Sequence, residues 1–326
     1  MAVERVEGRR RLRGESPSRI AWRVFLRNRV AAAGMVTVAV FFGVALSGLM
    51  LTKGDRPILD PREVRLPDKL QPPLSTPNRE ALPPELRPRL GVYLFGTDEL
   101  GRDVFARMLE GSFVSLAVGF VAVGIAVAIG LVLGGVAGYY GRVPIGIGRF
   151  RPMTVDTLIT GLIDVMLSFP SFFLILTVVA ILRPSIWNIM IVIGLTSWEG
   201  TARFVRAEIL SLREQEFVQA AAALGAPGPR VVLRHLIPNS VAPVMVSATL
   251  GIAGAILTES GLSFLGFGVP PPDATWGNIL ADGKRYLFDA PWLTFIPGTA
   301  ILILVLAFNL FGEGLREAFN PRLRQG

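Results

Sequence analysis

The chain has 326 residues, of which 51% are hydrophobic and 18% are charged, and its mean hydropathy is +0.52. This composition excludes an ordinary soluble domain and is typical of a helical membrane protein. The net charge is +8, but the arginines lie beside apolar runs, so we interpret them as determinants of membrane orientation rather than as a nucleic-acid surface. The absence of cysteine excludes disulfides and thiolate chemistry, and the single histidine, His235, excludes a histidine metal centre.

Residues 1–30 are rich in arginine, and the sequence predicts an interfacial helix within them. The apolar residues Ile20, Trp22, Val24 and Phe25 lie between arginines, a pattern that suits a helix on anionic lipid headgroups. A nucleic-acid-binding arm is the alternative, which the apolar run directly after it disfavours. The arginines that carry this pattern are Arg9, Arg10, Arg11, Arg13, Arg19, Arg23, Arg27 and Arg29. We expect this end to be cytoplasmic and residues 31–51 to be a retained first span that runs outward.

Residues 52–112 form a proline-rich polar segment that we expect to be external, extended and weakly ordered. Its end, Phe95–Val104, reads FGTDELGRDV. This string predicts a glycine turn followed by the start of a helix, with Asp98 as the cap and Glu99 near the positive helix end.

Residues 113–310 form the core domain, with five further apolar runs, and 311–326 form the tail. The predicted spans are Phe113–Tyr140, Asp156–Leu182, Ile186–Gly200, Val241–Leu262 and Leu293–Leu310. Arginines in the inner loops and tail place both termini in the cytoplasm. These are Arg142, Arg149, Arg151, Arg316, Arg322 and Arg324. The fold class is therefore an all-α, polytopic membrane protein with about six transmembrane helices.

Several residues within this core domain carry structural expectations. Gly130, Gly134 and Gly138 recur every fourth residue and predict a seam where two helices touch. Pro170 should kink the third span. Trp276, after the fifth span, is expected at the membrane interface.

Two acidic residues lie within the spans. A central charge such as Asp164 costs about 2.5 to 3.5 kcal/mol, so it needs a partner or a wet cavity. Glu259 lies toward the outer end of the fifth span. Both are candidates for a translocation pathway, with structural pairing as the alternative. Glu199 and Arg203 are four residues apart and predict a solvated pair.

The segment 202–238 is a polar interruption with an ordered pattern. Leu212–Leu224 predicts a helix that the alanines Ala220–Ala223 leave smooth on one side. Gly225 should end this helix in the left-handed conformation. A second short helix is expected over Arg230–Leu236, and Pro238 should mark the boundary with the next span.

Catalytic motifs are absent from the sequence. There is no phosphate-cradling GxxxxGK[ST], no HExxH and no GxSxG, which argues against an ATPase or a membrane hydrolase. A secondary transporter driven by an ion gradient remains an alternative, although such proteins usually place several ionisable residues at mid-membrane. A membrane scaffold is the other alternative, but it would not need the helix pair of 202–238.

The segment also resembles the cytoplasmic loop motif of ABC importer permeases: Glu-Ala-Ala, three residues, Gly, nine residues, Ile-x-Leu-Pro. Here the spacing is intact, and Gln219, His235 and Ile237 depart from the pattern, which leaves a salt bridge at the glutamate position in question. In that family this loop docks into a cleft of the ATP-hydrolysing subunit. The resemblance implies that the residues that contact the ATPase are Gln219, Ala220, Ala221, Gly225, His235, Ile237 and Pro238.

Two other strings resemble permeases of the dipeptide, oligopeptide and nickel group. One is the Gly-Thr-Asp-x-x-Gly-Arg-Asp signature before the second span; the other is TESGLSFLGFGVPPPDATW, Thr258–Trp276. The signature residues are Gly96, Thr97, Asp98, Gly101, Arg102 and Asp103. The resemblance extends from the first span to Arg324.

The resemblance implies a type I ABC importer permease in the inner membrane of a prokaryote. The implied partners are a second, related permease subunit (a heterodimer), two ATP-binding subunits that carry ATP and Mg, membrane lipid and an external solute-binding protein. The chain itself would bind no cofactor and no metal and would not be an enzyme. Peptides are the implied cargo, with nickel or another small solute as the alternative.

Overall fold

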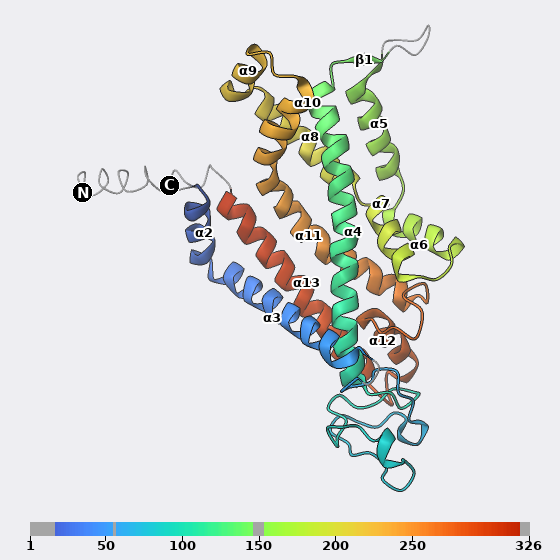
Figure 1. The fold of residues 1–326 in the computed structure, drawn as a ribbon. Coiled ribbons are helices and arrows are strands. Elements are labelled where there is room, and N and C mark those ends of the chain that lie inside the picture. Colours follow the sequence, from blue (N-terminus) through green and yellow to red (C-terminus); the bar gives the residue numbers. More distant parts are fainter. Residues whose placement is uncertain (1–16, 55–56, 146–152, 320–326) are drawn as a thin grey trace, which may run out of the picture.

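The computed structural model describes residues 17–54, 57–145 and 153–319, and most of them are helical (Figure 1). The α-helices are α2 (Pro17–Arg27), α3 (Arg29–Thr52), α4 (Val104–Tyr140), α5 (Val155–Ser168), α6 (Ser171–Ile181), α7 (Ile186–Leu195), α8 (Glu199–Arg213), α9 (Glu216–Ala223), α10 (Gly228–Val231), α11 (Ile237–Phe264), α12 (Trp276–Gly283) and α13 (Trp292–Phe319). The shorter elements are the 3₁₀ turns η1 (Leu66–Asp68), η2 (Pro84–Leu86) and η4 (Lys284–Tyr286), the π turn η3 (Val232–Leu236), and the antiparallel strands β1 (Pro144–Ile145) and β2 (Met153–Thr154). Some of the arginines on which the predicted membrane orientation depends lie outside the described residues: Arg9, Arg10, Arg11, Arg13, Arg149, Arg151, Arg322 and Arg324.

Among these helices, four are long and apolar enough to cross a membrane: α3, α4, the continuous run 228–264 that contains α11, and α13. The bent pair α5–α6 makes a fifth span if it crosses as one unit. The span predicted over 186–200 is interrupted, because α7 is a ten-residue apolar helix that ends at Leu195 and α8 begins at Glu199. The all-α, multispan fold expected from hydropathy is confirmed.

α4 runs through the centre of the bundle, with α3 and α13 on one side and α5 on the other (Figure 1), and α8 packs along α4. A Cβ added at Gly130 would lie 2.7 Å from the Thr201 side chain, and one at Gly134 would lie 2.5 Å from the Ala202 carbonyl oxygen. Gly138 meets Ile209 at 2.9 Å in the same way. The predicted glycine seam therefore exists, and its partner is α8.

The first helices pack against the last one. The Asn28 side chain caps α3 by accepting hydrogen bonds from the backbone N–H groups of Val30 and Ala31, at 3.1 Å each. In α2, Phe25 is buried and its ring meets the Phe311 ring of α13 edge-on. Trp22, one turn earlier in α2, stacks on the Phe25 ring and remains exposed, as an interfacial helix requires.

The third span is broken rather than kinked. α5 and α6 meet at an angle of 81° on either side of Phe169 and Pro170. Pro170 has no backbone N–H to continue α5, and it stands as the cap of the next helix.

Residues 57–103 form a compact lobe beyond the ends of α3 and α4 (Figure 1), and the expectation of an extended, weakly ordered segment is wrong. Tyr93 is fully buried and donates its hydroxyl to Asp68 at 2.7 Å. Burial and this bond raise the pKa of Tyr93, so it stays a protonated donor. The backbone N–H of Asn78 also donates to Asp68, at 3.1 Å. The prolines aid this closure because their fixed φ lowers the entropy lost on ordering.

Two local predictions at this end of the bundle need correction. The cap of α4 is Asp103, whose carboxylate accepts from the Phe105 N–H at 2.8 Å, so the second span begins nine residues before the predicted Phe113 and Asp98 has another role. Trp276 is buried rather than interfacial, and its indole N–H donates to the Met108 carbonyl at 3.1 Å.

The opposite end of the bundle carries α9, and we call it the α9 end. The predicted helix Leu212–Leu224 is two helices, because α8 ends at Arg213 and α9 begins at Glu216. The predicted second short helix is present, because residues 230–236 are helical, and α11 begins at Ile237, one residue before the predicted boundary at Pro238. The two are not separate, however, since the chain is helical without a break from Gly228 into α11. The π turn η3 explains this continuity: the Ile237 N–H bonds to the Val232 carbonyl, a wider turn just before Pro238.

Candidate functional site

α9 presents an apolar surface to solvent at the α9 end. Val218 is buried and Ala221 half-buried, so these residues attach the helix to the bundle. Ala220, Ala222 and Ala223 are exposed. Leu224, directly after the helix, is 89% exposed, which is unusual for a large aliphatic side chain. An exposed apolar patch on a short, small-sided helix is typical of a protein contact surface.

A hydrogen-bonded turn fixes the end of this surface. Gly225 has φ +80°, the left-handed conformation expected from the sequence. Its N–H donates to Ala222 O at 3.0 Å, and the Ala226 N–H donates to Ala221 O at 3.1 Å. These two bonds define a Schellman motif. A Cβ at Gly225 would meet nothing within 4 Å, so glycine is required here for its backbone conformation.

Gln219 lies at the start of the exposed surface, on the wall of a cavity of about 340 Å³. Its amide donates to the Glu214 carbonyl at 3.3 Å, across the break between α8 and α9. Arg213, on the same wall, donates to the Tyr139 carbonyl at the end of α4, at 3.2 Å. The glutamine thus holds the turn between the two helices, and the arginine ties this turn to the central helix.

His235, Ile237 and Pro238 lie on the neighbouring helical run rather than on α9. His235 is in the π turn, and its carbonyl accepts from the Asn239 side chain at 2.7 Å. Pro238 is exposed and Ile237 half-buried. Gly228 packs against the Tyr139 and Tyr140 rings, which sets the close approach of this run to α4.

The signature residues of the lobe form a buried ionic network at the other end of the bundle. Asp98 is fully buried and accepts from Arg102 at 2.7 Å and from Arg107 at 2.5 Å. Arg107 also donates to Asp282 of α12 at 2.9 Å. The Thr97 carbonyl accepts from the Trp292 indole N–H of α13 at 3.2 Å. These residues attach the lobe to α4, α12 and α13.

The backbone conformation and the close packing at two signature positions require glycine. Gly96 (φ +77°) and Gly101 (φ +72°) both occupy the left-handed region. A Cβ at Gly96 would lie 2.5 Å from the Gln71 carbonyl, and one at Gly101 would collide with the Arg65 carbonyl. The signature therefore has a structural role in this chain.

Asp164 is paired with an arginine, which is one of the outcomes that the sequence left open. Its carboxylate accepts from Arg203 of α8 at 3.1 Å, and both side chains remain exposed, by 62% and 58%. The predicted pair between Glu199 and Arg203 is wrong, because Arg203 turns to α5 instead. A second ion pair joins the same two helices nearer the start of α5, where Arg206 donates to Asp156 through two nitrogens at 2.5 Å each.

Glu259 is enclosed by protein. It is fully buried in α11, and its carboxylate accepts from the Ser263 hydroxyl at 2.8 Å. Its other carboxylate oxygen has no hydrogen-bond partner, and a place in the translocation pathway stays a prediction for this residue.

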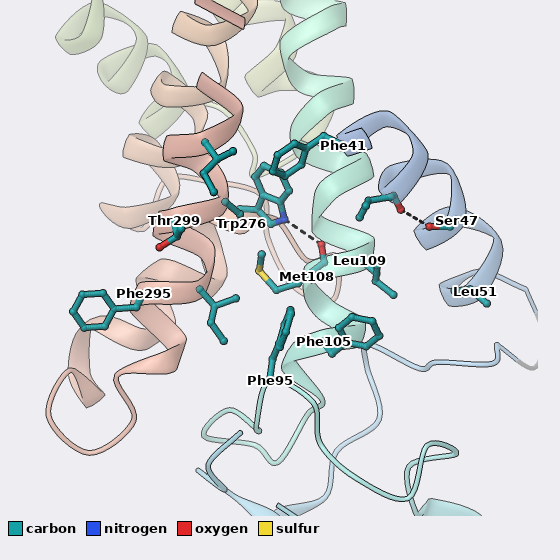
Figure 2. A pocket seen from close by; sticks show the side chains of 14 residues that line it. Phe41, Ser47, Leu51, Phe95, Phe105, Met108, Leu109, Trp276, Phe295 and Thr299 are labelled. Carbon is teal, nitrogen blue, oxygen red and sulfur yellow. Dashed lines mark hydrogen bonds between the residues drawn. The ribbon is translucent and has the colours of Figure 1, made fainter. Parts of the chain in front are cut away.

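A cavity of about 780 Å³ opens between α3, α4, α12 and α13 (Figure 2). Its wall is mostly aromatic and aliphatic, including Phe41, Phe105 and Phe295. The polar groups of Trp276 and Ser47 donate to backbone carbonyls, as the dashed lines in Figure 2 mark. Because these two donors are already used, they are not available to hydrogen-bond a charged or polar cargo.

Comparison with known proteins identifies the class. Residues 130–325 match the family model described as binding-protein-dependent transport system inner membrane component, and residues 16–73 match the N-terminal TM domain of oligopeptide transport permease C. The chain therefore belongs to the family of inner-membrane components of binding-protein-dependent transport systems.

The chain is also similar to individual transport proteins. The chain is 37% identical to the dipeptide transport system permease protein DppC of Alkalihalophilus pseudofirmus, over 95% of this chain and 91% of that protein. It is 35% identical to a putative peptide transport system permease protein of Brucella abortus, over 95% and 94%. A solved structure of the MetNI methionine ABC transporter superposes with a TM-score of 0.50 at 18% identity, covering 64% of this chain and 95% of that one, which supports the fold.

These findings confirm an ABC importer permease. The orientation expected from the arginines of the sequence would make the α9 end the inner end of the bundle and the lobe the outer end. Sequence reasoning missed Leu224, Arg107 and Asp282. Leu224 follows the alanine run and precedes the glycine that ends the helix. An apolar residue at this position was the feature of the sequence that could have indicated an exposed contact residue. Nothing local in the sequence connects Asp282 to Asp98.

Proposed function

We propose that this chain is one of two related permease subunits of an ATP-driven importer of di- or oligopeptides. One of two ATP-binding subunits would dock on α9 at the inner end, and an external solute-binding protein would deliver the peptide at the outer end. The names of the similar proteins support the peptide cargo. ATP and Mg would bind to the partner subunits.

The exposed apolar surface of α9 carries this proposal. Leu224, Ala220 and Ala223 are uncovered, while Val218 fixes the helix to the bundle. A docked ATP-binding subunit would bury this surface, and its movement would pass through the Gln219 and Arg213 contacts to α8 and α4. The glycine seam between α8 and α4 gives the movement a stiff, close-packed path.

Reconstitution in liposomes tests the proposal. The complete complex should take up a labelled dipeptide only when ATP and the solute-binding protein are both present. Uptake driven by a proton gradient without ATP would contradict it and favour a secondary transporter. ATP-dependent uptake of nickel with no uptake of peptide would keep the importer and replace its cargo.

A further inference from the structure

A cavity of about 230 Å³ lies between α4, α7, α8 and α11, inside the hydrocarbon region of the membrane. α4 has 37 residues, so it is about 55 Å long at 1.5 Å per residue. The hydrocarbon core is about 30 Å thick, so any core that α4 crosses within its length contains the midpoint of the helix. That midpoint is Ala122, which lines the cavity together with Ala126. The depth of the cavity therefore does not depend on where the membrane boundaries fall along α4.

Hydroxyl groups without partners line this cavity. They belong to Ser197, Thr201 and Ser247, and none of the three has a hydrogen-bond partner among the residues that the structure describes. Other hydroxyls of the helices, such as those of Thr196 and Thr249, donate to a carbonyl of the preceding helical turn. Thr201 is only 8% exposed, so little besides the cavity is open to it.

The cavity suits an uncharged ligand that forms hydrogen bonds. A free hydroxyl inside hydrocarbon is costly unless an occupant of the cavity bonds to it. The cavity is far larger than the roughly 10–15 Å³ that one water needs, so it admits a larger polar group as well as water. A hydroxyl both donates and accepts, and so does a peptide group through its N–H and C=O. No charged side chain is among the described residues that line the cavity, so it offers no counter-ion to a charged group.

Two glycines of α11 leave room for the main chain of such a ligand. Gly251 and Gly254 both line the cavity, and neither has a positive φ that would itself require glycine. A Cβ at Gly254 would meet nothing within 4 Å, so the space beside this residue is open. The missing side chains let another backbone approach α11 closely.

A second cavity continues from this one toward the start of α11. It has a volume of about 610 Å³ and lies between α8, α11 and α13. Ser247 lines both cavities. The wall of the larger cavity carries the polar side chains of Glu208, Asn239 and Arg316. A polar route thus runs from the middle of the bundle toward the first turn of α11.

We propose that the smaller cavity is a binding site for the uncharged peptide groups of the cargo, which hydrogen-bond to the hydroxyls of Ser197, Thr201 and Ser247 during passage through the membrane. This inference rests on the proposed function for its cargo. Each peptide group exchanges bonds to water for bonds to these hydroxyls. Because the site bonds to main-chain groups and carries no charge, peptides of different sequence bind to it alike.

Thiol labelling tests whether the cavity is wet, and it does not involve cargo. In the complete complex, with partner subunits free of cysteine, Ser247→Cys should react with a small, charged thiol reagent about tenfold or more faster than Gly43→Cys, because charged reagents are excluded from hydrocarbon. Gly43 is exposed near the middle of α3, outside the cavity. Equal, slow labelling at both positions would overturn the proposal.

Filling the cavity tests whether the cargo uses it. Gly254→Leu should lower ATP-dependent dipeptide uptake about tenfold while the complex still assembles, because the new side chain enters open space. Gly43→Leu is the matched control, since a Cβ there also meets nothing within 4 Å, and it should transport normally. Unchanged uptake by Gly254→Leu would overturn the proposal and leave the cavity as a water-filled void only.

Removing the hydroxyls tests the hydrogen bonds without filling the cavity. Ser247→Ala with Thr201→Val nearly keeps the size of the wall and should lower dipeptide uptake about tenfold, as the loss of two hydrogen bonds to the cargo predicts. Unchanged uptake in this variant would overturn the proposal even if Gly254→Leu fails to assemble. A wild-type complex that takes up no peptide would instead refute the proposed function, and the labelling difference would still show a wet cavity.

Discussion

The backbone N–H of Ala226 donates to the carbonyl of Ala221 at 3.1 Å, and this bond closes the turn through which the chain leaves α9. It places Leu224 outside the turn, exposed beside the alanines of the helix. The surface proposed to receive force from the ATP-binding subunits thus depends on the left-handed residue Gly225.

Gly225→Val should uncouple transport while leaving membrane insertion intact. A left-handed conformation costs a residue with a Cβ about 1–2 kcal/mol, and more for a β-branched one, so the end of α9 would unwind. ATP-dependent uptake in liposomes measures the effect. Gly225→Asn is the matched control, because asparagine adopts this conformation more readily. Normal uptake by the valine variant would contradict the role of this turn.

A bulky side chain on the half-buried face of α9 should have a similar effect. Ala221→Phe would push α9 away from the bundle and disturb the buried contact of Val218 in the same helix, so we expect loss of assembly or of coupling. Co-purification of the ATP-binding subunits measures assembly, and uptake measures coupling. If both stay normal, α9 is not the docking helix.

Leu224→Glu should weaken binding of the ATP-binding subunits about tenfold or more, as for an anchor residue at an interface. The side chain makes little contact within this chain, so the fold should not change. Titration of the purified ATP-binding subunits against the permease pair measures affinity. Leu224→Met keeps an apolar side chain and should bind normally; equal affinities for the two variants would show that this residue lies off the interface.

Asp98→Asn should destabilise the outer lobe by about 3 kcal/mol, because it removes the buried carboxylate that pairs with both Arg102 and Arg107. Thermal unfolding of the purified complex in detergent reports the change. Asp273→Asn, which removes an exposed pair with Arg62, should change stability by no more than about 1 kcal/mol. A similar small effect at Asp98 would mean that the network does not hold the lobe.

Gly134→Ala should destabilise the seam between α4 and α8 by about 1–3 kcal/mol, because the added methyl group would meet the Ala202 carbonyl. Gly124→Ala on the same helix is the control, since its Cβ would meet nothing within 4 Å. The melting temperatures of the two variants in detergent measure the effect. Equal values would show that close packing at the seam does not stabilise the protein.

The sequence predicted the elements whose cause is local. Hydropathy located the long spans, the spacing of Gly130, Gly134 and Gly138 predicted a packing seam, and Gly225 marked the end of α9. Each follows from a periodicity or a backbone preference that a short window of residues contains.

The misjudged features depend on residues far apart in the chain. The lobe is compact because Tyr93 reaches Asp68, and Asp98 is a network centre because Arg107 and Asp282 converge on it. Arg203 pairs with Asp164 rather than with its helical neighbour Glu199, since α5 packs beside α8. The break at Glu214 and the π turn before Pro238 were missed because residues on both sides favour helix.

Cross-linking from α9 tests the central claim most directly. The chain contains no cysteine, so Ala220→Cys supplies a single thiol on the exposed face of α9, and Leu90→Cys supplies one on the outer lobe. In the complete complex, the thiol at position 220 should cross-link to an ATP-binding subunit and the thiol at position 90 should not. A cross-link from position 220 to the external solute-binding protein, or to no ATP-binding subunit, would contradict the account.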